Sequence, residues 1–471
     1  HRFGQAQVET DERCNQCHHE GDDRCGEQVV EDGGCKHRTT VVKTMLLRPF
    51  VKPTCCTDTV YCHYGSGMPG ALLHPFAKPT RESFIRIVRG EGALLWDENG
   101  RELVDGMSSL WYCAIGHGRA EMADAIAAQV RSIESYSCFD PFTTGPAEEL
   151  AEELRAIGPM PDARVFLTGS RSESIDTAMK LARMAHVQAG QPQRKLIISR
   201  GRGYHGTAYG GTSAQGIAPN RENFGPFVDD VVQAPADDVE GLATIMAQRS
   251  NEVAAVLVEV VQGAGGIHPA PDGYLEQARR LCDMHGAYLI FDEVITGFGR
   301  LGTWFGAHRY GVTPDLVTFA KAVTSGYQPL GGVFVGPAPT AALETNPDFF
   351  LRHGFTYSGH ATACAAALKN LEIMRREELV ERANHVGGRL EAGLRALAAD
   401  GTIQHVRGMG AMWAAGLHEH QNAMSMRDHM LDNAGVICRA LNTDSLLFCP
   451  PLVTTDAQVD RIVDSIAAAA R

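Results

Sequence analysis

Two charged residues end two short apolar segments in the middle of the chain, where their types and placement suit chemistry. Asp292 follows the apolar run 287–291, and Lys321 follows the run 316–320. Apolar runs of this length, each stopped by a charge and separated by glycine-rich loop, are typical of buried parallel strands. Open α/β sheets bind ligands at the carboxyl ends of such strands. We therefore expect Asp292 and Lys321 to lie at one edge of a sheet.

An acid and a lysine in this arrangement have two interpretations. They suit pyridoxal phosphate (PLP), because the lysine can hold the cofactor as a Schiff base while the acid keeps the pyridine nitrogen protonated. They are equally compatible with a structural ion pair at a strand edge, since buried and half-buried pairs are common. The spacing alone does not separate the two interpretations.

Several motifs in a fixed order resemble the class III aminotransferases, a branch of the fold-type I PLP enzymes. The clearest are LVEVVQGAGGIHPAPDGYL, LIFDEVITGFGR and PDLVTFAK, and the resemblance runs from about His74 to the C-terminus. It implies an α/β fold in which a large, doubly wound, mostly parallel sheet domain binds PLP and a smaller α+β domain is built from both chain ends. It also implies a homodimer with the active site at the subunit interface.

The resemblance implies catalytic roles for Lys321 and Asp292. Lys321 is the lysine that holds PLP, and Asp292 is the acid that pairs with the ring nitrogen. Tyr204 stacks on one face of the pyridine ring, and Val294 packs against a ring face. The implied cofactor-binding residues are Ser170, Arg171, Ser172, Tyr204, His205, Glu259, Asp292, Val294, Lys321 and Thr356 of the partner subunit, which reaches the phosphate.

The turn around Arg171 departs from the family pattern. A strand ending at Thr168 gives way to a helix, and Ser170 and Glu173 have the spacing of a capping box. A helix N-terminus with hydroxyl groups is an anion site, and in the family this turn, usually Ser-Gly-Ser, holds the cofactor phosphate. If the turn needs a positive φ, Arg171 is strained there, whereas a guanidinium beside the phosphate would add a charge-assisted contact. We expect steric displacement to prevail, so that Arg171→Gly tightens PLP binding.

Two further residues match substrate-binding positions of the family. Trp111 corresponds to an aromatic wall of the substrate pocket, although burial in the core alone would also explain a tryptophan there. Arg439 corresponds to the arginine that meets substrate carboxylates, for which a guanidinium fork is better suited than an ammonium. A lone arginine is otherwise usually a surface residue. Ile295 resembles the ω-amine:pyruvate group of the family rather than members acting on ornithine-like or 4-aminobutyrate substrates.

The expected activity is therefore transfer of an amino group from an amine or ω-amino acid to a keto acid such as pyruvate. The related adenosylmethionine-8-amino-7-oxononanoate (biotin-pathway) aminotransferases share these motifs and are the first alternative. An aminomutase or decarboxylase of the same fold is a second. A pseudoenzyme that binds PLP weakly is a third, because of Arg171.

Composition excludes some other classes of partner. The chain has 471 residues, 44% of them hydrophobic, and a formal net charge of −13. It is long and apolar enough for a sizeable core, and its acidity argues against a nucleic-acid or anionic-membrane partner, which would need a basic face. No apolar segment approaches the roughly 18 residues that span a bilayer. We expect a cytoplasmic protein without a metal.

The first 67 residues read differently from the remainder of the chain. They carry seven of the 13 cysteines and lack apolar periodicity. We expect a disordered or non-native extension, with the true start at Met45 or Met68; the Cys14-x-x-Cys17 pair as half of a zinc site is the alternative. The predicted divisions are an extension at 1–67, the first part of the small domain at 68–115, the large PLP-binding domain at 116–345 and the remainder of the small domain at 346–471.

Overall fold

The computed structural model describes residues 71–471. The chain divides into two units, His1–Thr80 and Arg81–Arg471, and all the elements named below belong to the second. The predicted extension 1–67, with its Cys14-x-x-Cys17 motif, lies outside the described residues.

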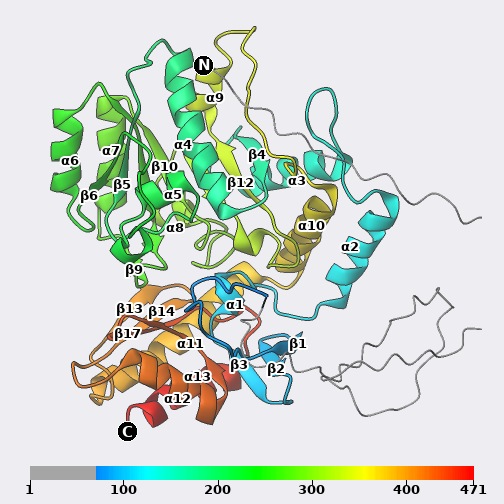
Figure 1. Ribbon diagram of the computed structural model, residues 1–471, viewed down its shortest axis with the longest axis vertical. Coiled ribbons are helices and arrows are strands. Elements are labelled where there is room, and N and C mark those ends of the chain that lie inside the picture. The colour runs from blue at the N-terminus through cyan, green and yellow to red at the C-terminus, as the bar shows by residue number, and fades with distance from the viewer. Residues whose placement is uncertain (1–70) are drawn as a thin grey trace, which may run out of the picture. The chain divides into compact units, whose positions relative to one another are not determined.

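A seven-stranded sheet, whose strands are drawn in Figure 1, contains both β10, which ends at Asp292, and β11, which precedes Lys321. Its strand order is β4-β12-β11-β10-β7-β5-β6. Neighbouring strands are parallel except that β12 is antiparallel to both β11 and β4. The mostly parallel sheet predicted from the apolar runs is therefore confirmed. The strands are β4 (Arg164–Thr168), β5 (Leu196–Arg200), β6 (Val231–Ala234), β7 (Val253–Glu259), β10 (Tyr288–Asp292), β11 (Leu316–Phe319) and β12 (Gly331–Val335).

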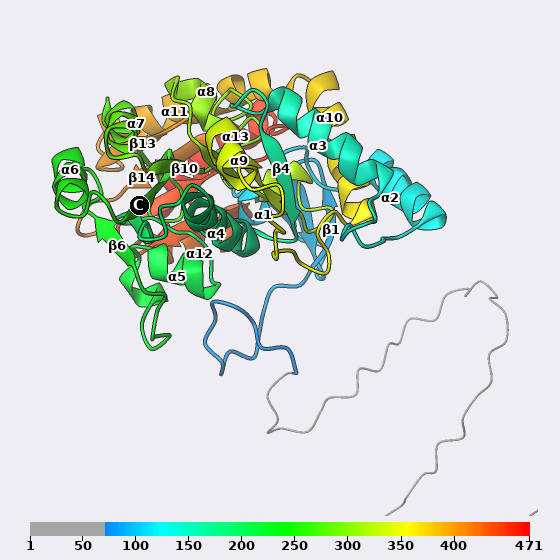
Figure 2. The same ribbon diagram turned by 90° about the horizontal axis from the view of Figure 1, so that it is seen from above.

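Helices cover both faces of this sheet, as a doubly wound fold requires (Figure 2). The central strand β10 shows why, because its side chains alternate between the faces. Ile290 packs in the cluster of α4, whereas Leu289 and Phe291 pack in the cluster that contains α6 and α7. The helices on the first face are α4 (Arg171–Gln188), α5 (Tyr209–Ala214) and α9 (Pro337–Leu343), and those on the second include α6 (Val239–Gln248) and α7 (Tyr274–His285).

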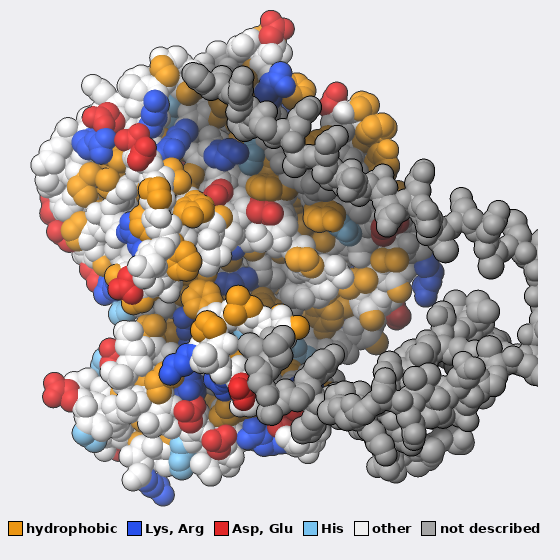
Figure 3. Space-filling view, in the orientation of Figure 1, with side chains coloured by type: hydrophobic (Ala, Val, Ile, Leu, Met, Phe, Trp, Pro, Cys, Tyr) orange, Lys and Arg blue, Asp and Glu red, His pale blue; other side chains and the backbone are white. Residues whose placement is uncertain are grey.

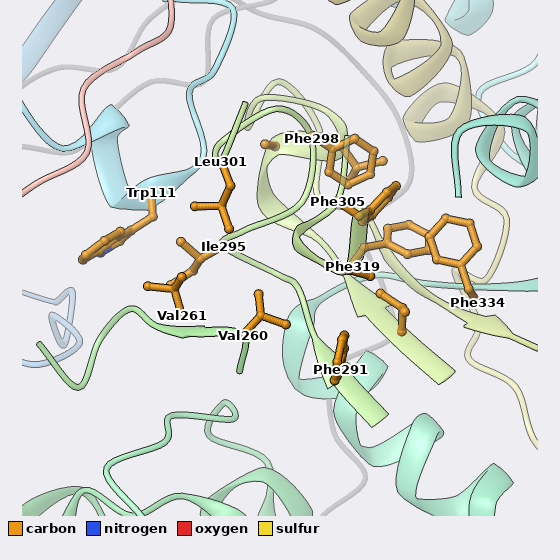
Figure 4. Close-up of a cluster of buried hydrophobic side chains, with 14 of the residues drawn as sticks. Trp111, Val260, Val261, Phe291, Ile295, Phe298, Leu301, Phe305, Phe319 and Phe334 are labelled. Atoms are coloured by element: carbon orange, nitrogen blue, oxygen red, sulfur yellow. The ribbon is translucent and has the colours of Figure 1, made fainter. Parts of the chain in front are cut away.

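Phenylalanine side chains fill the core close to the carboxyl ends of β10 and β11 (Figure 4). Phe298 and Phe319 meet edge to face with ring centroids 6.0 Å apart, and Phe305 and Phe334 do so at 5.3 Å. Such arrangements stabilise aromatic pairs beyond the area they bury. All of these rings are almost fully buried, so the strand ends that hold Asp292 and Lys321 rest on a closely packed base.

Segments from both ends of the chain join in a smaller sheet, β1-β2-β3-β15. Strands β2 (Leu94–Asp97) and β3 (Glu102–Asp105) form a hairpin, and the Asp97 carboxylate accepts the backbone N–H groups of Asn99 and Arg101 in its turn. Strand β15 (Val436–Ile437) then pairs in parallel with β3. The other strand of this sheet is β1 (Ile87–Glu91). The predicted domain boundaries at residues 115 and 345 remain predictions.

A second four-stranded sheet completes the C-terminal part. Its order is β13-β14-β17-β16, and helices α11 (Leu379–Ala399), α12 (Ala423–Ala434) and α13 (Asp456–Ala469) pack with it. Helices α2 (Ala120–Ser132), α3 (Gly145–Ile157) and α10 (Ala361–Arg376) pack together beside the large sheet. The strands of the second sheet are β13 (His405–Met409), β14 (Met412–Gly416), β16 (Arg439–Leu441) and β17 (Ser445–Phe448).

The surface carries both signs of charge. On the face drawn in Figure 3, acidic and basic side chains of the described residues are interspersed, with hydrophobic side chains between them. Within residues 71–471, none of the helices has both the length and the apolar character needed to cross a bilayer.

Candidate active site

The structure brings Asp292 and Lys321 to the same edge of the large sheet. Asp292 is the last residue of β10, and Lys321 follows the end of β11, the strand beside it. Lys321 has a φ of +50°, which a residue other than glycine adopts rarely and which often marks a functional position. The sequence pattern of a buried strand stopped by a charge thus places both residues correctly.

Asp292 is buried, and each of its two carboxylate oxygens accepts two hydrogen bonds. Oδ2 accepts from His205 Nδ1 at 2.8 Å and from Arg171 Nη2 at 2.6 Å, and Oδ1 accepts from Val294 N at 3.2 Å and Thr318 Oγ1 at 3.4 Å. Burial alone raises the pKa of a carboxyl, but the Arg171 cation and the His205 hydrogen bond hold the pKa of Asp292 well below its usual range. Asp292 is therefore an anion, as a partner of a protonated ring nitrogen must be.

Lys321 has the opposite electrostatic situation. Burial, followed by repulsion from the Arg171 cation, lowers the pKa of Lys321 to about 7, against the weaker attraction of the Asp292 and Glu259 carboxylates. A large share of the amine is therefore neutral near pH 7. A neutral amine is both a nucleophile toward a carbonyl and a base.

The alternative of a simple structural pair between Asp292 and Lys321 does not describe this site. Within the described part of the chain, the ion pairs of Asp292 are those with Arg171 and His205. The carboxylate has a cationic partner, and that partner is not the lysine.

Only one of the two hydrogen bonds of the predicted capping box is present at the start of α4. Ser170 is the N-cap, and its hydroxyl accepts the N–H of Glu173 at 3.3 Å. The Glu173 carboxylate reaches the N–H of Gly169 at 2.6 Å rather than that of Ser170, so the capping box is not reciprocal. The Ser172 hydroxyl accepts the N–H of Thr207 at 3.0 Å. Both serine hydroxyls keep their own proton for an anion at the helix N-terminus.

Arg171 is the first residue of α4 and is not among the residues with positive φ. The positive φ that would strain the backbone at Arg171 is therefore absent, and the effect of Arg171→Gly on PLP binding stays a prediction. The reason is that the turn reaches the helix through the extended Ser170, whose φ is −160°, so that position 171 already has helical backbone. Any effect of Arg171 must come from its side chain.

The Arg171 side chain lies at Asp292. Its Nη2 donates to Asp292 Oδ2 at 2.6 Å and to the Tyr204 carbonyl oxygen, and it lies 3.8 Å from Glu259 Oε2. Its guanidinium carbon lies 4.7 Å from the centroid of the Tyr204 ring. Arg171 thus contacts the acid expected to pair with the ring nitrogen and the aromatic expected to stack on the ring.

The loop that carries Tyr204 and His205 is held by Glu259. Glu259 Oε1 accepts the N–H of Tyr204 at 2.8 Å, and Oε2 accepts the N–H of Gly263 at 3.2 Å. Burial raises the pKa of Glu259. His205 is fully buried, and its Nε2 has no hydrogen-bond partner among the described residues. Val294 is buried as well, two residues beyond Asp292.

The three remaining predicted residues lie in different surroundings. Trp111 is 2% exposed and packs in the core cluster with Val261 and Ile295 (Figure 4), while its Nε1 has no partner within residues 71–471. Arg439, in β16, is half-buried, and burial lowers its pKa while the Tyr204 hydroxyl acts in the opposite direction. Thr356 is exposed. Trp111 therefore has the packing of a core residue, and Arg439 is close enough to Tyr204 for an electrostatic interaction.

One residue of the site was missed from the sequence. Thr318 donates to Asp292 because it is the direct neighbour of Asp292 in the β10–β11 register. The signal for Thr318 was its position three residues before Lys321 in a strand predicted to lie beside the Asp292 strand.

Comparison with known proteins identifies the family. The model of the aminotransferase class-III family matches residues 76–470. The chain belongs to this family. It is therefore a PLP-dependent aminotransferase of fold-type I, an enzyme that uses an amine donor and a keto-acid acceptor.

Individual relatives agree with this assignment over most of the chain. The β-alanine–pyruvate aminotransferase of Pseudomonas aeruginosa is 36% identical over 426 residues, which cover 85% of this chain and 94% of the relative. A thermostable (S)-enantioselective ω-transaminase from Thermomicrobium roseum superposes with a TM-score of 0.80 at 36% identity, over 84% and 95% of the two chains. An amine transaminase from an uncultivated Pseudomonas species, solved in its PLP-bound form, gives 0.80 at 33% identity, over 85% and 98%.

The residues of this chain fit PLP, except that one side chain already contacts two of the groups that the cofactor needs. A buried anion, a largely neutral half-buried lysine and a helix N-terminus with two hydroxyls are the groups that a pyridine nitrogen, an aldehyde and a phosphate require. His205 Nε2 adds a buried polar atom that has no hydrogen-bond partner within residues 71–471. The Arg171 guanidinium is the exception, because it already contacts Asp292 and Tyr204.

Proposed function

We propose that this aminotransferase moves the amino group of a primary amine or ω-amino acid to pyruvate, with Lys321 and Asp292 as its catalytic residues. The observation that carries the proposal is a half-buried lysine with a pKa of about 7 at the same sheet edge as a buried carboxylate that stays ionised. When bound, PLP supplies an electron sink that makes the carbon bearing the amino group acidic.

The residues around PLP have separate tasks in this proposal. Asp292 keeps the ring nitrogen protonated, and His205 orients Asp292 through the 2.8 Å hydrogen bond to Oδ2. Ser170, Ser172 and the N-terminus of α4 bind the phosphate. Glu259 acts indirectly, because its hydrogen bond to the Tyr204 N–H fixes the loop whose aromatic ring faces the cofactor. Val294 packs against the ring.

Lys321 has the second catalytic task, which is proton transfer. When PLP is bound, the Lys321 Nζ would be its covalent anchor. As a free amine, the same nitrogen would accept the proton of the donor carbon and return it. The pKa of about 7 matches this role, since a base that must both accept and return a proton works best near the operating pH.

Substrate preference follows from Arg439 and Trp111. Arg439 is the half-buried cation near Tyr204 and supplies the bidentate contact that a keto acid or ω-amino acid carboxylate requires. Trp111 and Ile295 supply an apolar wall for the carbon chain of the donor. The relative named as a β-alanine–pyruvate aminotransferase supports an ω-amino acid donor and pyruvate as acceptor.

We infer a homodimer in which Thr356 of the partner subunit reaches the phosphate. The exposure of Thr356 supports this, as do large apolar side chains exposed near it in the sequence and on the segment before α3. These are Tyr136, Phe139, Phe142, Phe350 and Tyr357. We also infer a cytoplasmic location, supported by six cysteines that are unpaired in the described residues.

A donor panel tests the activity. Purified protein with PLP is supplied with pyruvate and β-alanine, putrescine, or a simple aryl amine, and alanine formation is measured. We expect alanine with at least one of these donors. If none gives alanine while 2-oxoglutarate is aminated, or if no acceptor is aminated, the proposed reaction is wrong.

The catalytic lysine is tested by Lys321→Ala, with Lys369→Ala as the matched control, because Lys369 pairs with Glu372 on the surface. Lys321→Ala should lose at least about 10³-fold in rate and should retain no PLP after borohydride reduction and dialysis. Lys369→Ala should retain both. Covalent PLP on the Lys321→Ala protein would place the anchor elsewhere.

A further inference from the structure

We propose that the Arg171 guanidinium and the PLP ring compete for the same two groups, so that Arg171 is an internal latch that PLP must displace in order to bind. The two groups are the Asp292 carboxylate and the face of the Tyr204 ring. The inference rests on the proposed role of Asp292 as the partner of the ring nitrogen.

Chemical similarity is the first argument. A guanidinium is flat, permanently cationic and weakly hydrated, and it both stacks on aromatic rings and donates to carboxylates. A protonated pyridine ring is likewise flat and has the same sign of charge at its nitrogen. Arg171 makes both contacts here, at 2.6 Å to Asp292 Oδ2 and 4.7 Å to the Tyr204 centroid.

The saturation of Asp292 is the second argument. Its two oxygens already accept from His205, Arg171, Val294 and Thr318. A carboxylate offers about four acceptor positions, so a ring nitrogen can be accommodated only if one donor leaves. The Val294 donor is backbone, Thr318 lies on the neighbouring strand, and His205 is fully buried. Arg171 is the donor at the end of a long, flexible side chain, and it is the one that can leave.

Incomplete pairing is the third argument, because it explains how displacement is possible. Nη2 makes both of the hydrogen bonds of the guanidinium, while Nε and Nη1 are buried without partners in the described chain. Buried donors without acceptors destabilise the arrangement that leaves them so. Arg119, by contrast, holds Glu377 with two nitrogens, at 2.7 and 2.6 Å. The Arg171 guanidinium thus engages its hydrogen-bond acceptors through one nitrogen, where Arg119 uses two for Glu377.

This competition predicts effects of opposite sign with and without PLP. Without PLP, Arg171 is the cation nearest to two buried carboxylates, Asp292 and Glu259. Its removal should lower the melting temperature of the PLP-free protein, because a buried carboxylate without its cation is destabilising. With PLP, the same removal should tighten binding, because the competitor is gone.

The experiment compares Arg171→Ala with Arg279→Ala. Arg279, in α7, pairs with Asp315 at 2.7 Å. Asp315 directly precedes β11, so this pair lies at the amino end of the strand, opposite to the site. Both substitutions place alanine in a helix. For each PLP-stripped protein, the melting temperature and the PLP dissociation constant are measured, the latter by absorbance titration. Both variants should melt below the wild type. Only Arg171→Ala should bind PLP more tightly. The expected gain is about 10-fold or more, because PLP no longer has to displace the charge-assisted hydrogen bond from Arg171 to Asp292.

Arg171→Gly, which gives the turn the residue usual in the family, provides the second variant and should tighten PLP binding similarly. A dissociation constant that rises in both Arg171 variants would show that the guanidinium is a ligand of the cofactor, and an unchanged constant would show that it does not compete; either result overturns the proposal. Tighter PLP binding in a protein that aminates no keto acid would leave the latch intact and reject the proposed activity.

Discussion

The two halves of the cofactor site are built in different ways. The β10–β11 edge places Asp292 and Lys321 by backbone register, since each follows a buried strand and the strands are hydrogen-bonded neighbours. The α4 turn also has a fixed backbone, but its most influential group is the end of one long side chain, Arg171. Groups fixed by register can be placed from sequence, whereas the end of a flexible side chain depends on which partners it finds.

The largest effect is expected on the free energy of unfolding of the PLP-free protein. A double-mutant cycle of Asp292 and Arg171 measures how strongly the two halves of the site interact. Asp292→Asn removes the carboxylate charge and leaves the buried Arg171 with only the more distant Glu259 carboxylate, 3.8 Å away, so unfolding should become easier by about 3–5 kcal/mol. In an Arg171→Ala background, the same change should cost much less, because the pair is already broken. Urea unfolding of the four proteins gives the coupling energy. Additive effects would mean that Arg171 and Asp292 do not interact in solution.

The next largest effect is expected for Arg439→Ala, on the activity toward substrates that carry a carboxylate. Losing a charged, half-buried hydrogen-bonding partner should weaken keto-acid acceptors and amino-acid donors by about 30- to 1,000-fold, or roughly 2–4 kcal/mol. Simple amines lack the carboxylate and should lose far less as donors when the acceptor is saturating. The measurement is kcat/KM for β-alanine and for an aryl amine. Equal losses for both donors would reject Arg439 as the carboxylate site.

The pH dependence of stability tests the lowered pKa of Lys321, which belongs to the half of the site at the β10–β11 edge. The pKa of Lys321 is lowered from 10.5 to about 7 in the folded protein, mainly by burial. Between pH 7 and about 10, the unfolded chain therefore binds a proton at this lysine that the folded chain does not, and the free energy of unfolding rises with pH through this window. Relative to Lys321→Met, the PLP-free wild type should gain stability from pH 7 to 9.5 in urea unfolding. A difference that stays constant over this range would mean that Lys321 keeps its ordinary pKa.

The smallest effect is expected from deleting residues 1–67. The family match begins at residue 76, and every residue assigned to the site lies beyond residue 100. PLP content and transaminase rate should stay essentially unchanged, measured on the truncated and the full chain side by side. Zinc bound stoichiometrically by the full chain, with activity lost on chelation, would contradict this and favour the metal interpretation.

Sequence patterns predicted the sheet and the placement of its charged ends because both depend on features that are local in the chain. Apolar runs that stop at Asp292 and near Lys321 are strands, and strands that alternate with helices form a parallel sheet. The roles assigned to these residues stay predictions until they are tested. The Thr318 contact needed the register between two strands, which only the folded sheet provides.

The Arg171 interaction lay beyond sequence reasoning for a different reason. Its backbone is ordinary helix, so the argument from glycine geometry failed. Its partners, Asp292 and Tyr204, are 121 and 33 residues further along the chain. A helix N-terminus indicates a phosphate as the neighbour of a guanidinium at position 171, whereas the side chain lies beside the Asp292 and Glu259 carboxylates.

The position of β12 has a consequence for the order in which the protein can fold. This antiparallel strand lies between β4 and β11, and Gly331 is the direct partner of Thr168, the last residue before the α4 turn. Strand β4 is an edge strand with no other partner in the sheet. A nascent chain that ends before residue 331 would therefore expose β4 unpaired, and contacts so distant in sequence form slowly. The α4 turn is completed only when β12, the last strand of this sheet to be synthesised, inserts beside β4, the first.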